Sequence, residues 1–362
     1  MPHDAELAAW LKLSLVQGLG GQSLRRLLAA FGLPQQVLAA GRGALERIVS
    51  AEIAGRIRSD LDAPAVDAAM EWAAEDGHAV LTLADSDYPQ ALLATPDPPA
   101  LLYLHGRCEL LARPGLAVVG SRNATPQGIS NAEQFARAFS AAGLTIVSGL
   151  ALGIDAAAHR GGLEEAGSTI AVFGTGADIL YPQRNRALGE RIAREGLIVS
   201  EFPLGTPPYG GNFPRRNRVI SGLARGCLVV EATLASGSLI TARLAAEQGR
   251  EVFALPGSIH SPHAKGCHAL IKQGAKLVES AQDLLQELGM NGLATPPAAT
   301  APAVSGFLAH LGYDPCDIDT LCARSGLTAD AVSAMLLQLE LEGKVAGLPG
   351  GLYQRTSLRG SD

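Results

Sequence analysis

The middle of the chain alternates short apolar runs with longer segments of helical composition. Strands that are buried on both faces of a parallel sheet have such Val-, Ile- and Leu-rich runs, and a helix usually connects each strand to the next. The alternation therefore predicts an α/β fold with a doubly wound, Rossmann-like, mostly parallel sheet. The predicted strands lie in LAVVG (116–120), LTIVSGLA (144–151), STIAVFGTG (168–176), LIVSEFP (197–203), CLVVEA (227–232), EVFALPG (251–257) and AKLVES (275–280).

Residues 1–75 have the pattern of a small helical N-terminal domain. A Gly-rich turn at 18–21 is followed by Leu24, Leu27 and Phe31 at helical spacing. This arrangement is typical of helix-hairpin-helix or SAM-like domains, whose turn amides can approach a DNA phosphate. The alternative is a small packing bundle. We favour the bundle, because residues 1–100 carry 7 Lys+Arg against 13 Asp+Glu and a DNA-binding surface is normally basic.

An extended Rossmann-like domain is predicted for residues 76–290, with residues 78–106 joining the edge of its sheet. The following segment, 291–306, is rich in Ala, Pro and Thr and is predicted to be a linker. Residues 307–362 suggest a winged helix, in which two helices precede a hairpin at VAGLPGGLYQR. The second of these helices carries Glu340 and no base within residues 331–343. This favours a regulatory or protein-binding role over insertion into a DNA groove.

The composition argues against a disordered protein and against a membrane-spanning one. Hydrophobic residues make up 47% of the chain and charged residues 18%, which describes a globular protein rather than a disordered one. The apolar runs are shorter than the roughly 18 residues that a membrane span needs. The cysteines are odd in number and form no C-x-x-C pair, as expected in a reducing compartment. We therefore expect a cytoplasmic protein without a membrane partner.

Three predicted strands end in loops of small residues, at 120–122, 148–155 and 174–176. Ligands of open α/β sheets lie at the carboxyl ends of strands, where helix N-termini present free amides to anions. The first loop, GSR, is not a G-x-G-x-x-G dinucleotide motif. It offers backbone donors and Arg122, whose planar guanidinium suits a phosphate. These loops predict an anion site at this edge of the sheet.

The strip GNFPRRNRVISGLA (211–224) is a basic segment in a chain whose formal net charge is −6. It holds Arg215, Arg216 and Arg218, and no acid occurs in the sequence between residues 201 and 231. If Pro214 lies in the first turn of a helix, Arg215 and Arg218 share one face and Arg216 lies beside them. Arginines without acidic partners near an anion loop favour phosphate binding over an ordinary solvated helix.

Some residues suggest catalysis or a metal instead. Asp155 and His159 could form an acid–base pair, but an N-cap and a packed histidine are the favoured alternative. Likewise Ser236 and Ser238, in EATLASGSLITA, are expected to cap a helix at a further anion-facing edge, because no nucleophile elbow surrounds them. A zinc site is disfavoured because the spacing fits no standard pattern. Its candidate ligands would be His260, His263, Cys267 and His268.

Long phrases of the chain resemble, in a fixed order, the DprA/Smf family of DNA-processing proteins. The resemblance covers roughly residues 80–290, and the flanking helical and winged-helix domains fit the architecture of that family. His268 stands where the family usually has Asn, a departure that concerns the hydrogen bonds of this loop rather than the pocket. The phrases are GSRNATPQG, SGLALGIDAAAH, GTGADILYP, SEFPLGTPP, NFPRRNRVISGLA, VVEATLASGSLITARLAAEQGREVFALPG and GCHALIKQGAKLV.

The resemblance implies a non-catalytic binder of single-stranded DNA that acts as a homodimer through the Rossmann-like domain. It would use no cofactor and no metal. It would protect incoming strands during natural transformation and load the recombinase RecA onto them. The DNA pocket of the family, carried over residue by residue, comprises Gly120, Ser121, Arg122, Phe213, Arg215, Arg216, Asn217 and Arg218.

The alternative is a nucleotide-processing enzyme of the phosphoribohydrolase type, which would use the same anion pocket. Such enzymes carry a P-G-G-x-G-T-x-x-E motif with a glutamate for the ribose chemistry. This chain has LPGS at 255–258 and LPGG at 348–351, and neither continues into that motif. A Walker A motif is also absent from the sequence. We therefore expect that the protein is not an enzyme.

Overall fold

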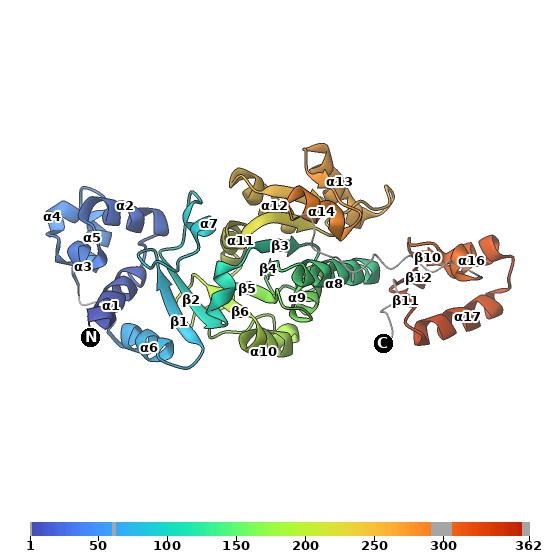
Figure 1. Ribbon diagram of the computed structural model, residues 1–362, viewed down its shortest axis with the longest axis horizontal. Helices are drawn as coiled ribbons and strands as arrows, with labels where there is room; N and C mark the ends of the chain where they lie inside the picture. The colour runs from blue at the N-terminus through green and yellow to red at the C-terminus, as the bar shows by residue number, and fades with distance from the viewer. Residues whose placement is uncertain (1, 60–62, 291–305, 357–362) are drawn as a thin grey trace.

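The computed structural model describes residues 2–59, 63–290 and 306–356. Helices α1–α6 lie at one end of the long axis, the large sheet lies in the middle, and the C-terminal module lies at the other end (Figure 1). The predicted boundaries at residues 75 and 290 remain predictions. The predicted linker, 291–306, lies outside the described residues except for its last position.

Nine strands of the described chain form one sheet in the order β1-β2-β6-β5-β4-β3-β7-β8-β9. Strands β3 to β9 are parallel to one another, whereas β2 pairs antiparallel with both β6 and the edge strand β1. The predicted doubly wound sheet is confirmed, and so is the edge position of residues 78–106. The strands are β1 (His78–Thr82), β2 (Leu101–Gly106), β3 (Gly115–Val119), β4 (Thr145–Ser148), β5 (Thr169–Phe173), β6 (Leu197–Ser200), β7 (Ala224–Val229), β8 (Glu251–Ala254) and β9 (Lys276–Leu277).

The order of the strands creates a switch point beside β3. Strands β4, β5 and β6 follow one another on one side of β3, whereas β7, β8 and β9 lie on its other side. The connections after β3 and β7 therefore lead away in opposite directions. This leaves a crevice at the carboxyl ends of these two strands, where open α/β sheets bind their ligands.

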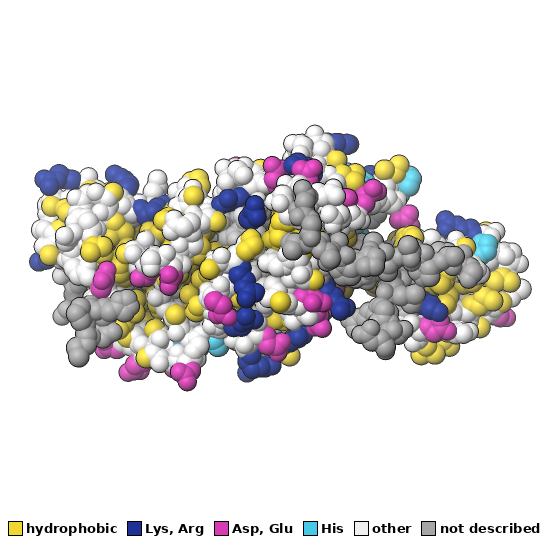
Figure 2. All heavy atoms as spheres, in the orientation of Figure 1, with side chains coloured by type: hydrophobic (Ala, Val, Ile, Leu, Met, Phe, Trp, Pro, Cys, Tyr) yellow, Lys and Arg dark blue, Asp and Glu magenta, His cyan; other side chains and the backbone are white. Residues whose placement is uncertain are grey.

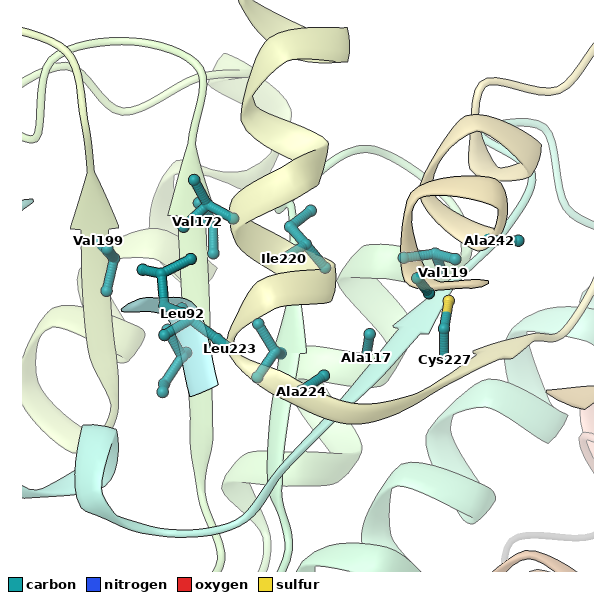
Figure 3. Close-up of a cluster of buried hydrophobic side chains, with 14 of the residues drawn as sticks. Leu92, Ala117, Val119, Val172, Val199, Ile220, Leu223, Ala224, Cys227 and Ala242 are labelled. Carbon is teal, nitrogen blue, oxygen red and sulfur yellow. The ribbon is translucent and has the colours of Figure 1, made fainter. Parts of the chain in front are cut away.

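Helices cover both faces of the sheet, and alternate side chains of β3 pack against the helices of opposite faces. Ala117 and Val119 pack in a cluster with α11 and α12, part of which Figure 3 shows around Ile220 and Leu223. Leu116 packs on the opposite side with α8 and α9. The helices of this domain are α7 (Gln90–Leu93), α8 (Pro126–Ala141), α9 (Ile154–Leu163), α10 (Arg186–Glu195), α11 (Asn212–Gly222), α12 (Ser238–Glu247), α13 (Lys265–Lys272) and α14 (Ala281–Glu287), with 3-10 turns at Cys108–Ala112, Gln183–Asn185 and Pro262–Ala264.

The N-terminal helices have their own core and rest on the edge of the sheet. Trp10 and Leu27 are buried together with Leu101 at the start of β2, and Leu11 is buried against Tyr103. An ion pair between Arg25 and Asp97 (2.5 Å) joins α2 to the segment before β2. The helices are α1 (Pro2–Ser14), α2 (Gly21–Phe31), α3 (Pro34–Ala39), α4 (Arg42–Leu45), α5 (Ala51–Arg58) and α6 (Ala63–Ala73).

The C-terminal module has the predicted order of a winged helix. Helix α16 (Ile318–Ser325) and helix α17 (Ala329–Leu341) precede a hairpin of β11 (Val345–Leu348) and β12 (Leu352–Arg355). Helix α15 (Leu308–Leu311) and strand β10 (Cys316–Asp317) complete the module around a small apolar core. Within the described ranges of the chain, no helix is both long and apolar enough to cross a bilayer.

Candidate functional site

A cavity of about 460 Å³ opens at the switch point between the ends of β3 and β7. Its volume lies within the range of small-molecule pockets, about 300–1,000 Å³. Six of the eight residues predicted for the site line it, so the two predicted halves do meet. Its walls are the loop Gly120, Ser121, Arg122 and Asn123; Phe213, Pro214, Arg216, Asn217 and Ile220 of α11; Thr233, Ala235, Ser236, Gly237, Ser238, Ile240 and Thr241; and Val119, Ala151, Asp155 and His263.

The loop after β3 is held tightly, yet it leaves one cation free. An ideal Cβ on Gly120 would lie 2.6 Å from Ile154 and 2.8 Å from the carbonyl oxygen of Glu231, so only glycine fits. The backbone N–H of Ser121 donates to that same carbonyl at 2.7 Å. Arg122 is exposed and has no hydrogen-bond or ion-pair partner among the described residues. A fixed loop thus presents an unpaired guanidinium at the cavity.

Arg216 forms the buried floor of the cavity. It is 4% exposed, and its Nη1 donates to the carbonyl oxygens of Gly149 (2.8 Å) and Val172. Burial lowers the pKa of Arg216 to about 10, while nearby Asp155 opposes this shift, so the side chain is charged at neutral pH. Its buried Nε has no partner within the described part of the chain. A buried positive charge with spare donor capacity therefore lies beneath Arg122.

Arg215 and Arg218 do share one face of α11, as predicted, but that face does not line the cavity. Arg218 pairs with Glu201 and with Asp97 (2.9 Å), and Arg215 lies 3.2 Å from Glu201. The premise that these arginines lack acidic partners is therefore wrong. Glu201 directly follows β6 in the sequence, and its side chain is only 4% exposed. The predicted contacts of Arg215 and Arg218 with DNA remain predictions.

Asp155 and His159 are structural, although Asp155 is not the predicted N-cap. The cap position of α9 is Gly153, and Asp155 lies in the first turn. Its carboxylate accepts hydrogen bonds from the backbone N–H groups of Gly149 (3.2 Å) and Ala151 (3.4 Å). His159 is buried between Leu150 and the hydroxyl of Thr169. Both side chains hold the loop after β4, which in turn accepts a hydrogen bond from Arg216.

The buried His159 predicts a specific dependence of stability on pH. Burial lowers its pKa to about 3 in the folded protein, whereas an unfolded histidine titrates near 6.5. Between these two pKa values the unfolded chain binds a proton at His159 and the folded protein does not. The free energy of unfolding therefore falls as the pH drops through this window, by up to about 1.4 kcal/mol per pH unit.

We expect urea denaturation to show that the free energy of unfolding falls more steeply on acidification for the native protein than for His159→Gln. Titrating carboxyl groups such as Asp155 are common to both proteins and cancel in the difference. Parallel pH profiles would contradict a neutral buried His159.

The β7–α12 connection also lines the cavity, and its predicted role as an anion-facing edge stays a prediction. The predicted capping role is wrong in detail, because the cap position of α12 is Gly237 and no side chain caps it. The hydroxyls of Ser236 and Ser238 bond to each other at 2.7 Å, and the Ser236 hydroxyl also accepts from the backbone N–H of Ser238 at 3.4 Å. His263 completes this wall, and its Nδ1 is buried without a partner in the described chain. Neither spacing nor composition of the sequence pointed to His263 as a wall of the cavity.

The histidine- and cysteine-rich segment after β8 is dispersed in the structure. Cys267 is buried and its thiol points to the carbonyl oxygens of Val229 and Val230 (3.7 Å each). His268 bonds through Nε2 to the carbonyl oxygen of Gly257 at 3.0 Å, so the family departure at this position still binds the loop backbone. In the ranges that the structure describes, no three His, Cys, Asp or Glu side chains are grouped so that they could hold a metal ion.

Charge outside the cavity is mixed. Figure 2 shows acidic and basic side chains interspersed over the face that it presents. The cavity itself brings together Arg122 and Arg216 with a single carboxylate, that of Asp155, among its lining residues. Because Asp155 is engaged by backbone amides, the cavity is a confined positive site on a chain of net negative charge.

Comparisons with known proteins agree with this arrangement. Protein Smf of Escherichia coli K12 is 42% identical over 79% of this chain and 80% of its own length. Protein Smf of Synechocystis is 38% identical over 97% of this chain and 99% of its own length. The crystal structure of DNA processing protein A from Streptococcus pneumoniae has 40% identity and a TM-score of 0.69, covering 77% of this chain and 95% of that one.

A second solved structure is DNA processing protein A from Helicobacter pylori, which was described for its single-stranded DNA binding mode. It has 33% identity and a TM-score of 0.52, and it covers 58% of this chain and 95% of that one. The DprA winged helix domain model matches residues 291–351, which agrees with the fold of the C-terminal module. The family model of DNA recombination-mediator protein A matches residues 79–289, and the chain belongs to this DprA/Smf family.

Proposed function

We propose that the protein binds single-stranded DNA in the cavity at the switch point, without sequence preference and without catalysing a reaction. The observation that carries the proposal is the pair of arginines there. Arg122 is unpaired on a rigid loop, and Arg216 is a buried charge with an unpartnered Nε beneath it. Two cations held at one concave site favour a polyanion, and the Helicobacter relative described as a single-strand binder supports this choice of ligand.

Phosphate contacts would come from three sources. The guanidinium of Arg122 can bind a phosphate through two parallel hydrogen bonds. The exposed Asn123 adds its side-chain amide as a further donor at the same cavity. Arg216 supplies charge from below. Arg215 and Arg218 are proposed to act differently, because their ion pairs with Glu201 fix the helix that carries Arg216.

Single strands are favoured over duplex because the cavity is lined by an aromatic side chain that can stack on an unpaired base. Phe213 lines the cavity beside Asn217, and an aromatic ring can stack on any base that is not enclosed in a duplex. Stacking and phosphate contacts carry no sequence information by themselves. The expected binding is therefore tolerant of sequence and sensitive to salt.

We extend the proposal to the protection of incoming strands and the loading of RecA during natural transformation, by a homodimer of this chain. Membership of the DprA/Smf family supports this part. The expected result is faster assembly of RecA on strands already coated with a single-strand-binding protein, at equal RecA concentration. RecA assembly that this protein leaves unchanged would remove the loading role and leave the DNA-binding role standing.

The proposed binding is tested by titrating fluorescent single strands, the matching duplex and mononucleotides. We expect micromolar or tighter binding of the single strand, weaker binding of the duplex and no turnover of mononucleotides. Release of a free base from a nucleoside monophosphate would instead support the phosphoribohydrolase alternative. Equal affinity for single strand and duplex would contradict the proposed ligand.

A further inference from the structure

Two aromatic rings lie side by side at the rim of the cavity. Phe213 of α11 is half-buried and lines the cavity, whereas Tyr181 belongs to the loop after β5. Their ring centroids are 5.6 Å apart, and the ring planes differ by 35°. Tyr181 is 42% exposed. The pair thus forms an aromatic surface that leads from the cavity along the carboxyl edge of the sheet, from β3 toward β5.

The backbone holds these rings in place without a ligand. An ideal Cβ on Gly174, at the end of β5, would lie 2.7 Å from the ring of Phe213, so glycine lets the ring rest on the backbone. The loop that carries Tyr181 is tied at both ends. Asn185 donates to the carbonyl oxygen of Leu150 at 2.9 Å, and the carboxylate of Asp178 accepts from the backbone N–H of Gly205. An exposed aromatic side chain on so rigid a loop costs little entropy to bind against.

The charged side chains near Tyr181 indicate which kind of ligand would bind against its ring. Arg184 follows within the same loop, is exposed, and has no ion-pair or hydrogen-bond partner in the described part of the chain. The acid of this loop, Asp178, is already engaged by the backbone of Gly205. An exposed aromatic ring with a free cation on one side and a cationic cavity on the other suits alternating bases and phosphates.

We propose that Tyr181 and Phe213 form a base-stacking platform that extends the single-strand site from the switch-point cavity toward the loop after β5. Arg184 then contacts the phosphate beyond the stacked base. The inference rests on the proposed function and adds the path that the strand takes away from the cavity. Paired bases keep their faces inside the helix, so the platform selects against duplex.

The test compares Tyr181→Ala with Tyr181→Phe on a short single strand that carries 2-aminopurine, a base whose fluorescence changes on stacking. Loss of one stacked base lowers affinity by roughly 5- to 150-fold, and we expect Tyr181→Ala to fall within that range. Tyr181→Phe should keep the affinity and the fluorescence change, because it keeps the ring. Since no charge is removed, the slope of log affinity against log salt should be the same in all three proteins.

An independent arm uses the native protein and strands in which one nucleotide at a time is abasic. We expect one or two adjacent abasic positions to weaken binding to the native protein and to have no effect on Tyr181→Ala. If Tyr181→Ala binds like the native protein while Arg122→Ala does not, the platform is refuted and the proposed function stands. If the native protein does not bind single strands at all, both are refuted. Equal thermal unfolding midpoints would show that the Tyr181 variants are folded.

Discussion

Replacing Arg216 with alanine is expected to lower the free energy of unfolding by about 3–5 kcal/mol, the usual cost of removing one member of a buried charge pair. The substitution leaves the carbonyl oxygens of Gly149 and Val172 without this donor, and it removes the positive charge that most favours the ionised form of the buried Asp155. Burial raises the pKa of Asp155, and the charge of Arg216 opposes that rise. Chemical denaturation followed by circular dichroism measures the loss.

Arg215→Ala is the matched control on the same helix. The side chain of Arg215 is 51% exposed, and its partner Glu201 keeps its ion pair with Arg218. Exposed pairs of this kind contribute about 0–1 kcal/mol. We therefore expect the unfolding curve of Arg215→Ala to lie close to that of the native protein. Similar losses in both variants would contradict the assignment of Arg216 as the buried floor of the cavity.

Replacing Arg122 with alanine is expected to weaken single-strand binding by about 10- to 100-fold without destabilising the fold. A hydrogen bond to a charged group contributes about 1.5–3 kcal/mol, and each 1.4 kcal/mol corresponds to a factor of about ten in affinity. Because Arg122 is exposed and has no hydrogen-bond or ion-pair partner within the described ranges, its removal breaks no hydrogen bond or ion pair of the folded protein. Fluorescence anisotropy and a denaturation curve on the same variant separate the two effects.

Arg113→Ala provides the control for charge. Arg113 is also exposed, but it precedes β3 and so lies at the amino end of the strand whose carboxyl end carries Arg122. Its guanidinium donates a hydrogen bond to the carbonyl oxygen of Ala166. The two variants have the same net charge, so an effect of general electrostatic attraction would appear in both. We expect single-strand affinity to fall strongly in Arg122→Ala alone.

The fold was largely predictable because its strands are buried on both faces. The run LAVVG and the IAVF stretch within STIAVFGTG carry no polar side chain, and the small residues that follow them place the loops at one edge. The order of strands that puts β3 beside β7 is a property of the tertiary packing, which local sequence does not encode. The meeting of the GSR loop with α11 was nevertheless expected, because both follow strands of one parallel sheet.

The roles of the individual arginines could not be predicted. Helical spacing placed Arg215 and Arg218 on one face, but only packing against the sheet decides which face is buried. Glu201 is separated from these arginines by a Pro-rich loop, so the sequence does not show that its side chain pairs with them. The same holds for His263, whose approach to the cavity depends on the path of the chain after β8.

The central claim is that the cavity between β3 and β7 binds the phosphates of a single strand through Arg122. Its most direct test is the salt dependence of single-strand affinity in the native protein and in Arg122→Ala. The slope of log affinity against log salt is about −0.7 for each phosphate neutralised on a single strand. We predict a negative slope for the native protein and a slope that is shallower by about 0.7 for Arg122→Ala. Identical slopes and identical affinities in the two proteins would contradict the claim.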